Sequence, residues 1–406
     1  MNEDRPIRIA ITQGDTNGVG FELIFKTFED PTMMELCTPI VYGSPKVASY
    51  YRKALETEVT YNVINDASEA KDGQLNLLAV IQEEVKVDMG QPTVDSAEAA
   101  VKALAKAVAD VRDGLVDALV AGPVNEQGFS FKDLHFQTQT ELVAQLLERH
   151  ARKTVQQAEG NAVQMHVTAS IHPLRVLMEG NLRVAVLADG IALKRVADHL
   201  SGERLTEVAT LLHQSLRRDL DVNNPRIAVL ALNPRGGVGD QPAEEERECI
   251  MPAIEQLANA GLQVYGPYSA EELLTPGQLY RFDAVLAMHR DQILAPFRLL
   301  TQGDGVVLSA GLPIVMTEAG HGACYGKTGK NEADPIALRH AIFAATDVAR
   351  HRQQWDEPMG NPLPKLYHER RDESEKVRFR SSERRGDASA TPQDTTDDGV
   401  TGEVES

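Results

Sequence analysis

The amino-acid sequence predicts an α/β fold with a buried parallel β-sheet. The continuous apolar run at residues 227–232 is typical of a strand that is buried on both faces, as the strands of parallel sheets are, and residues 7–12 and 283–288 are also predicted to be strands. Segments with helical spacing of apolar residues follow several of these runs, which is the alternation that α/β proteins show. Because α/β proteins bind ligands beyond the carboxyl ends of their strands, the residues after these runs are the first candidates for a functional site.

The expected elements alternate along the chain. Strands are predicted at residues 7–12, 39–43, 115–120, 227–232, 283–288 and 312–317, with a hairpin over residues 163–188 that turns at 179–181. Helices are predicted at residues 22–28, 46–54, 95–113, 193–218, 241–262 and 334–352. The spacing of Asp95 and Glu98 predicts a capping box at the start of one of these helices, and Gly114 is expected to end it.

The length of the chain predicts two domains followed by a tail. The 406 residues are 42% hydrophobic, which is enough for a sizeable core. From about residue 353 the composition changes, and residues 387–406 contain six acidic residues, no basic residue and few apolar ones. Such a stretch buries too little apolar surface to offset the entropy of ordering, so we expect residues 353–406 to be a charged, disordered tail.

Charge and cysteine content exclude several classes of function. The formal net charge of −19 argues against nucleic-acid binding, which needs a basic surface. No apolar run approaches the roughly 18 residues of a membrane span, and the first residues lack the form of a signal peptide. Three cysteines without C-x-x-C spacing fit a reducing compartment. We therefore expect a cytoplasmic protein that binds neither membranes nor nucleic acid.

Two strand ends carry candidate anion-binding sequences. Arg235 follows the run at residues 227–232 beside three glycines, and arginine can bind a carboxylate or phosphate through two hydrogen bonds. A surface or interdomain ion pair is the alternative role for Arg235. The glycine-rich loop at residues 14–20 either offers helix amides to an anion or is a tight turn, and Asp15 either lines the cleft or caps the next helix.

Several strand-end motifs together resemble the 4-hydroxythreonine-4-phosphate dehydrogenases. The resemblance covers roughly residues 7–350 and rests on Ile-Thr-Gln-Gly-Asp-Thr-Asn-Gly-Val-Gly20, Ala-Gly-Pro-Val-Asn125, Thr140-Glu141, Leu-Asn-Pro234, Asp291-Gln292, Ala-Gly-Leu-Pro313 and His321-Gly322. It implies the isocitrate/isopropylmalate dehydrogenase-like fold, in which two α/β domains flank a cleft. It also implies a homodimer and NAD-dependent oxidation and decarboxylation of a phosphorylated hydroxy-amino acid in vitamin B6 synthesis, with a divalent metal that polarises the hydroxyl group.

The implied domains are discontinuous in sequence. Residues 1–125 and 300–352 would form the first α/β domain, on the cofactor side. Residues 126–299 would form the second α/β domain, which carries the substrate side and the dimer contacts.

The positions of the family's metal and substrate residues are mostly substituted here. The three metal-binding histidines fall on Gly190, Arg235 and Arg290, and neither glycine nor a guanidinium group offers a lone pair to a metal. The resemblance therefore implies that the metal site is absent. The substrate positions fall on Gln139, Thr140, Arg298, Val307 and Met316, and Glu126 replaces a usual lysine.

The cofactor positions are better preserved. Residues 321–334 resemble the loop that holds the adenine end of NAD, and the cofactor-binding candidates in it are His321, Gly322, Gly329, Lys330 and Asn331. The alternative is that this loop only docks the last helix. Asp291, in the matching Asp-Gln motif, is the catalytic candidate, and His289 is expected to be structural, with a role as a displaced base as the alternative.

The sequence leaves three hypotheses for function. The standard reaction needs a Lewis acid, which these substitutions would remove, so we expect a divergent family member in which that reaction is lost or altered. In an altered enzyme, Arg235, Arg290 and Arg298 would replace the metal by direct charge. Alternatively, the protein is a non-catalytic binding or regulatory paralogue that holds a small anionic or phosphorylated ligand through the same three arginines.

Overall fold

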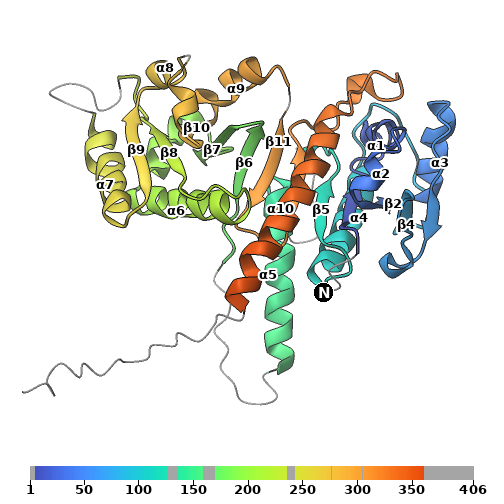
Figure 1. Cartoon of the computed structure of the whole chain (residues 1–406). Helices are drawn as coiled ribbons and strands as arrows, with labels where there is room; N and C mark the ends of the chain where they lie inside the picture. The colour runs from blue at the N-terminus through green and yellow to red at the C-terminus, as the bar shows by residue number, and fades with distance from the viewer. Residues whose placement is uncertain are drawn as a thin grey trace, which may run out of the picture. The chain divides into compact units, whose positions relative to one another are not determined.

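The computed structural model describes residues 5–126, 136–158, 170–235, 243–275, 277–303 and 305–360. These residues belong to one compact unit, Met1–Gly360, and the remaining 46 residues of the predicted tail, 361–406, lie outside the described residues. The unit has the predicted α/β fold (Figure 1). In the part of the chain that the structure describes, no helix is both long enough and apolar enough to cross a membrane.

One continuous β-sheet runs through the unit (Figure 1). Its strands in the described residues are β1 (Arg8–Thr12), β2 (Thr38–Gly43), β3 (Asn62–Ile64), β4 (Asn76–Ala79), β5 (Ala118–Ala121), β6 (Leu174–Glu179), β7 (Leu182–Ala188), β8 (Arg226–Leu230), β9 (Gln263–Tyr268), β10 (Ala284–His289), β11 (Val306–Ala310) and β12 (Met316–Ala319). Their order across the sheet is β3-β4-β2-β1-β5-β12-β11-β6-β7-β10-β8-β9. The pairs on both flanks are parallel, and the pairs β12–β11, β11–β6 and β6–β7 in the middle are antiparallel.

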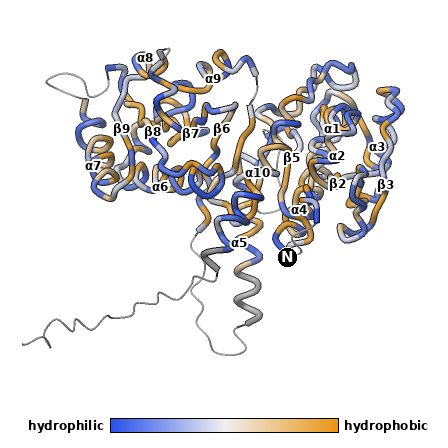
Figure 2. The backbone as a smooth tube through the Cα atoms, in the orientation of Figure 1, coloured by the Kyte–Doolittle hydropathy of each residue, from blue (hydrophilic) through white to orange (hydrophobic). Residues whose placement is uncertain are grey.

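The sheet is covered by helices on both faces, which explains the unbroken apolar runs in its strands. Side chains alternate along β1, so Ile9 and Ile11 belong to one buried cluster and Ala10 to another. Figure 2 shows apolar residues concentrated along the strands. Because such a strand has apolar neighbours on both faces, its residues are apolar in succession and do not alternate with polar ones.

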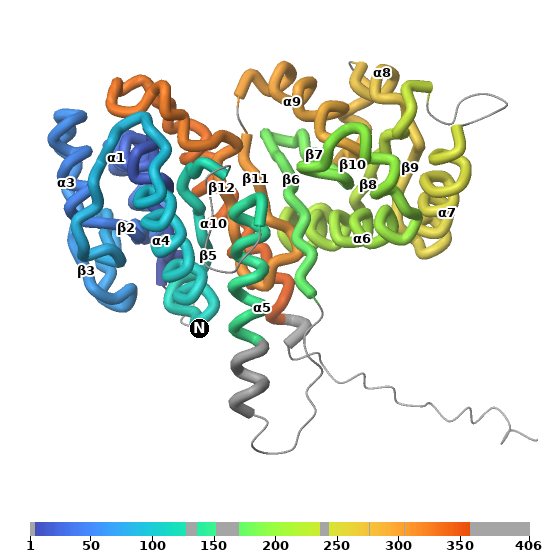
Figure 3. The backbone as a smooth tube through the Cα atoms, turned by 180° about the vertical axis from the view of Figure 1, so that it is seen from behind, coloured from blue at the N-terminus to red at the C-terminus, as the bar shows by residue number. Residues whose placement is uncertain are grey.

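The helices on the two faces come from different parts of the chain (Figures 1 and 3). One buried cluster joins the sheet to α1 (Gly20–Phe28), α3 (Pro45–Ala54), α6 (Gly202–Arg218), α7 (Met251–Asn259) and α10 (Ile336–Gly360). The opposite face packs against α4 (Val94–Arg112) and α5 (Gln139–Ala158) in one half, and against α8 (Ala270–Leu273) and α9 (Leu294–Thr301) in the other. The short α2 (Met33–Leu36) precedes β2.

Several predicted elements are confirmed, and the hairpin is the clearest case. β6 and β7 pair antiparallel and turn at Gly180, which has a positive φ of 55° that glycine adopts without strain. The predicted strands at residues 7–12, 39–43 and 283–288 correspond to β1, β2 and β10. The part of the predicted hairpin at residues 163–169 lies outside the described residues.

The predicted cap of α4 is wrong by two residues. The N-cap is Thr93, whose Oγ1 accepts a hydrogen bond from the amide of Ser96 at 3.2 Å, and Ser96 Oγ lies within 3.4 Å of the Thr93 amide. Thr93 has the extended backbone that a cap needs, whereas Asp95 already lies in the first helical turn. There its charge is favourable beside the helix dipole.

Two boundaries near the carboxyl end also differ from prediction. The strand expected at residues 312–317 begins only at Met316, because Gly311 and Pro313 belong to the connection between β11 and β12. β11 itself was not predicted. Helix α10 continues to Gly360, so eight residues assigned to the tail are helical.

Candidate functional site

A small pocket lies between the middle of the sheet and α9. Its volume is about 50 Å³, and its apolar lining comes from β6, β7, β11 and α9 through Leu177, Val184, Val186, Val307 and Leu294. The polar part of the lining is Arg175, Asp189, Arg290, Arg298 and Gly320. Hollows of about 560 and 860 Å³ are lined by other residues, including Arg352, and by none of the predicted site residues. A further hollow of about 480 Å³ beside α1 is lined by Asn331, and the small pocket is the one that Arg290, Arg298 and Val307 share.

Arg175, the second residue of β6, is the centre of the ion pairs at this pocket. Its Nη2 lies 3.1 Å from Glu318 Oε1 and 4.0 Å from Glu126 Oε1, and its Nη1 lies 3.8 Å from Asp189 Oδ2. Burial alone would lower the pKa of Arg175, but the three carboxylates together raise it above its ordinary value. The guanidinium group is therefore held in its charged form.

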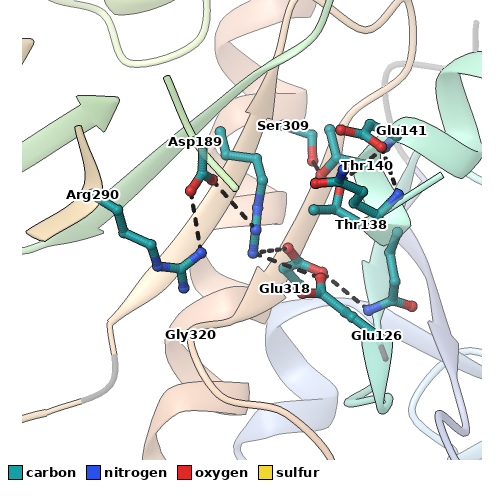
Figure 4. A network of polar contacts seen from close by, with 12 residues as sticks. Glu126, Thr138, Thr140, Glu141, Asp189, Arg290, Ser309, Glu318 and Gly320 are labelled. Carbon is teal, nitrogen blue, oxygen red and sulfur yellow. Dashed lines mark hydrogen bonds and ion pairs between the residues drawn. The ribbon is translucent and has the colours of Figure 1, made fainter. Parts of the chain in front are cut away.

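Asp189 joins this arginine to a second one. Its Oδ1 accepts a hydrogen bond from Arg290 Nη1 at 3.2 Å, while its Oδ2 faces Arg175. Figure 4 shows Asp189 with Arg290 on one side and Glu318 farther away on the other. Asp189 follows β7 and Arg290 opens η7 (Arg290–Gln292) after β10, so the pair joins the carboxyl ends of two adjacent parallel strands.

Glu318 joins the pocket to the start of α5. Its Oε2 accepts a hydrogen bond from Gln139 Nε2 at 3.0 Å, and the same Nε2 lies 3.2 Å from the carbonyl oxygen of Gly122. The next residue, Thr140, has its Oγ1 2.7 Å from Ser309 Oγ of β11 (Figure 4). The predicted substrate residues Gln139 and Thr140 are thus buried outside the pocket lining, and Gln139 is linked to the pocket residue Arg175 through Glu318.

The other predicted substrate positions divide between the pocket and the core. Arg298 of α9 is exposed and its Nη2 donates to the Gly320 carbonyl oxygen at 3.3 Å. Val307 forms part of the apolar lining, whereas Met316 is fully buried among side chains of the core. Asp291 is exposed, and the ion pair of Arg290 is with Asp189 rather than with Asp291.

Arg235 lies apart from the other two arginines of the anion hypothesis. It is exposed beyond the end of β8 and is not among the described residues that line the pocket. Residues 236–242, which include its neighbouring glycines, lie outside the described residues. Arg175 lines the pocket beside Arg290 and Arg298 instead.

Arg175, Asp189 and Glu318 were not among the predicted site residues. Two of the three have a signal in the sequence, since Arg175 and Glu318 are charged residues inside short, mostly apolar strands. A charge is rarely buried in a strand unless a partner neutralises it. A charged residue inside a strand predicts that Arg175 and Glu318 each have a partner of opposite charge. It does not predict that they pair with each other across 143 positions.

The residues at the positions that the resemblance assigns to metal ligands do not fit a divalent cation. Arg290 donates a hydrogen bond to Asp189 and has no lone pair to offer an ion. Gly190 has no side chain and adopts a positive φ of 71°, and a Cβ placed there would lie 2.7 Å from Gln137 Oε1. Among the residues that the structure describes, no group of three His, Cys, Asp or Glu is placed to hold a metal ion.

The glycine-rich loop at residues 14–20 is a tight turn filled by protein. A Cβ on Gly14 would lie 2.4 Å from the Pro123 carbonyl oxygen, and one on Gly18 would lie 2.8 Å from the Ala323 carbonyl oxygen. The Val19 amide donates to that same oxygen of Ala323 at 3.1 Å. Of the two readings of this loop, the structure supports the turn, because its glycines contact protein backbone where an anion would have to lie.

Asp15 ties this turn to the predicted cofactor loop. It is buried, and its carboxylate accepts hydrogen bonds from the Asn17 amide at 2.8 Å and from the Tyr325 hydroxyl at 2.7 Å. Tyr325 begins η8 (Tyr325–Lys327) within the cofactor loop. Burial and the neighbouring Asp15 raise the pKa of the Tyr325 hydroxyl well above its ordinary value, so the phenol stays protonated and donates.

The far end of the cofactor loop is fixed to α1. Lys26 Nζ donates to the carbonyl oxygens of Asn331 and Ala333, both at 2.8 Å, and Glu22 Oε1 accepts the Ala333 amide at 2.9 Å. One side of the loop is therefore docked on protein. The other side leaves Gly322, Lys330 and Asn331 exposed and His321 partly exposed, while Gly329 packs toward Met89.

The exposed side of the loop carries positive charge. Lys327 and Lys330 are exposed on it, and their positive charge suits the phosphate groups of an anionic cofactor. The loop also directly follows Gly320, which lines the pocket. The loop and the pocket are therefore adjacent in the sequence.

Comparison with known proteins identifies the family. The family model described as "Pyridoxal phosphate biosynthetic protein PdxA" matches residues 35–345. A 4-hydroxythreonine-4-phosphate dehydrogenase from Bacteroides thetaiotaomicron is 40% identical over 377 residues, which is 93% of this chain and 98% of the relative. One from Geobacter metallireducens is 32% identical and covers 84% of this chain and 96% of its own length.

Solved structures agree with this assignment. The crystal structure of a 4-hydroxythreonine-4-phosphate dehydrogenase from Burkholderia phymatum has a TM-score of 0.66 and 25% identity, and the match covers 85% of this chain and 99% of that one. The Klebsiella pneumoniae structure of the same name has a TM-score of 0.68 at 24% identity, covers 85% and 100%, and shows the same fold. The protein described here belongs to the PdxA family of pyridoxal phosphate biosynthetic proteins.

Proposed function

We propose that the protein is an NAD-dependent dehydrogenase of a phosphorylated hydroxy acid in which guanidinium groups replace the divalent metal ion. One observation carries this proposal: Arg290, Arg298 and Val307, three positions that the resemblance assigns to the site, line a single pocket. The similarity to enzymes named 4-hydroxythreonine-4-phosphate dehydrogenase supports the substrate class. That compound, or one with the same phosphate and hydroxy acid groups, is the proposed substrate.

The proposed cofactor site is the exposed side of the loop at residues 321–334. His321, Gly322, Gly329, Lys330 and Asn331 would hold NAD, which supplies the hydride acceptor when it is bound. The proposal includes the two-domain division into residues 1–125 with 300–352 and residues 126–299. It also includes a homodimer, as the resemblance implies.

The arginines supply the charge that the reaction needs. The oxidation would need a hydride acceptor, which bound NAD would supply, and Asp291, exposed next to Arg290 in the chain, is the proposed acceptor of the hydroxyl proton. Decarboxylation then breaks a C–C bond, releases carbon dioxide and leaves the electron pair on an enolate oxygen. A guanidinium group in the pocket would stabilise that oxygen and would also bind the substrate anion.

The test is an assay for NADH formation at 340 nm with 4-hydroxythreonine-4-phosphate and NAD. We expect a rate that EDTA does not lower and that magnesium, manganese or zinc does not raise. Arg290→Met should lower kcat/KM by about 10- to 100-fold, which corresponds to the roughly 1.5–3 kcal/mol of a hydrogen bond to a charged group. The control is Arg247→Met, because Arg247 is exposed and pairs only with Glu248 among the described residues. A rate that requires added metal would contradict the proposal.

A second candidate is a non-catalytic paralogue that holds an anion through Arg235, Arg290 and Arg298. It is favoured by the observation that Arg290 and Arg298 line one pocket although the metal positions bear no ligand side chain. In that case 4-hydroxythreonine-4-phosphate raises the melting temperature and no NADH forms. If the compound still raises the melting temperature of Arg235→Ala but not that of Arg290→Ala, the anion binds in the pocket and not at Arg235.

A further inference from the structure

The side chain of Arg175 lies among three carboxylates that come from three separate segments. Glu126 follows β5, Asp189 follows β7 and Glu318 belongs to β12. The guanidinium nitrogens lie between 3.1 and 4.0 Å from an oxygen of each. The side chains of Glu318 and Arg175 are 6% and 23% exposed, and those of Asp189 and Glu126 are 31% and 37% exposed, so water screens the Arg175–Glu318 contact least.

Three carboxylates this close together are stable in their charged form only beside a positive charge. Like charges that share a poorly solvated site repel one another and raise one another's pKa values. The pKa of Glu126 is indeed raised, first by burial and also by the charge of Glu318, although Arg175 counteracts the shift. In many enzymes a divalent metal ion neutralises such a group of oxygens.

Here the chain itself supplies the cation. A guanidinium group carries one positive charge and five N–H donors, and it can contact several carboxylates at once. It offers no lone pair, and its charge repels a metal ion, so a metal and Arg175 cannot share the space between the three carboxylates. Through Asp189 the group also orients Arg290 at the pocket.

We propose that Arg175 is a built-in cation that takes the place of a divalent metal ion at this site. Its single positive charge offsets part of the negative charge of Glu126, Asp189 and Glu318, and it positions Arg290 through Asp189. The proposal deepens the proposed function, and it rests on that function only for the role of Arg290. The neutralising role can be tested without substrate and without NAD.

The experiment compares manganese binding by the wild-type chain and by variants of Arg175. Arg175→Met keeps a side chain of similar length but removes the charge, whereas Arg175→Lys keeps the charge. The matched control is Arg183→Met, because Arg183 lies in the same hairpin and donates to the carbonyl oxygens of Asn181 and Asp283, not to a carboxylate. Binding is measured by electron paramagnetic resonance of free Mn²⁺ and by the melting temperature.

Arg175→Met should bind one Mn²⁺ per chain and melt at a higher temperature with manganese than without. The wild type, Arg183→Met and Arg175→Lys should show neither effect. Adding Glu318→Gln to Arg175→Met should weaken the new manganese binding at least tenfold, because it removes one of the three charges. If Arg175→Met folds only with manganese present, that result also supports the proposal.

Three results would overturn it. The first is manganese binding by the wild type as strong as that by Arg175→Met. The second is an Arg175→Met chain that binds no manganese, or that stays unfolded when manganese is present. The third is manganese binding by Arg175→Lys. Failure to detect NADH in any assay would count against the proposed function and would leave these results unaffected.

Discussion

Tyr325 donates its phenolic hydrogen to the carboxylate of Asp15 across 2.7 Å, and so joins two loops that are 310 positions apart in sequence. The first loop is the glycine-rich turn after β1, and the second is the proposed cofactor loop. Their backbones also meet where the Val19 amide donates to Ala323. The glycine-rich turn therefore serves as a rigid support for the cofactor loop.

Tyr325→Phe should loosen the cofactor loop. Asp15 is buried and would lose one of its donors, so we expect the free energy of unfolding to fall by about 1–3 kcal/mol, the range for a hydrogen bond to a charged group. Hydrogen exchange in residues 321–331 should accelerate, and the Kd for NAD should rise. The exposed Tyr280 provides the control Tyr280→Phe, which should change neither quantity. Unchanged exchange in Tyr325→Phe would show that the contact does not fix the loop.

Lys26→Met tests the other end of the same loop. The substitution removes the donor to the carbonyl oxygens of Asn331 and Ala333, and it leaves the buried Glu22 without its ion pair. We expect a loss of about 1–3 kcal/mol in urea unfolding. Lys86→Met removes an exposed pair with Asp88 and should cost no more than about 1 kcal/mol. Equal losses of unfolding free energy in Lys26→Met and Lys86→Met would show that Lys26 does not hold the cofactor loop.

The raised pKa of Glu126 predicts a pH effect with a definite sign. Burial favours the protonated form of Glu126 in the folded protein. Between the ordinary pKa of glutamate and the higher pKa of Glu126 in the folded protein, the folded state therefore holds a proton that the unfolded state has lost. Stability contributed by this group therefore falls as the pH rises through the folded-state pKa. Glu126→Gln should be more stable than the wild type at neutral pH, and the difference should disappear at pH values below the ordinary glutamate pKa. A difference that grows as the pH falls would contradict this sign.

The cysteines provide a chemical probe of the cofactor loop. Burial raises the pKa of the Cys37 thiol to about 12, so it should react with a thiol reagent only after unfolding. Cys324 is exposed in the cofactor loop and should react first. Saturating NAD should slow its labelling several-fold, and Cys324→Ser should remove the fast phase. A fast phase that NAD leaves unchanged would argue against cofactor binding at this loop.

The parts of the fold that the sequence predicted are those with local patterns. β1, β2 and β10 are apolar runs buried on both faces, and the β6–β7 hairpin contains a glycine at its turn. β9 was not predicted because it is an edge strand with half-exposed residues and no apolar run. β11 was not predicted although Val306-Val307-Leu308 is a buried apolar run, so the local rule that found β1 and β10 also applies to it.

Part of the pocket was predictable from the sequence, and the ion pairs around Arg175 were not. The resemblance marked positions 290, 298 and 307, and the structure places all three at one pocket. The arrangement of charges around Arg175 was not predictable, since its partners come from positions 126, 189 and 318. No local pattern encodes which distant carboxylate a buried arginine will meet, because that depends on the order of strands in the sheet.

Calorimetric titration of 4-hydroxythreonine-4-phosphate into the protein in the presence of EDTA tests most directly whether guanidinium groups replace the metal ion. If guanidinium groups replace the metal ion, the wild type should bind the compound without any divalent cation. Arg290→Met should raise the Kd by about 10- to 100-fold, while Arg247→Met should leave it unchanged. Binding that disappears with EDTA and returns with magnesium or manganese would contradict the claim.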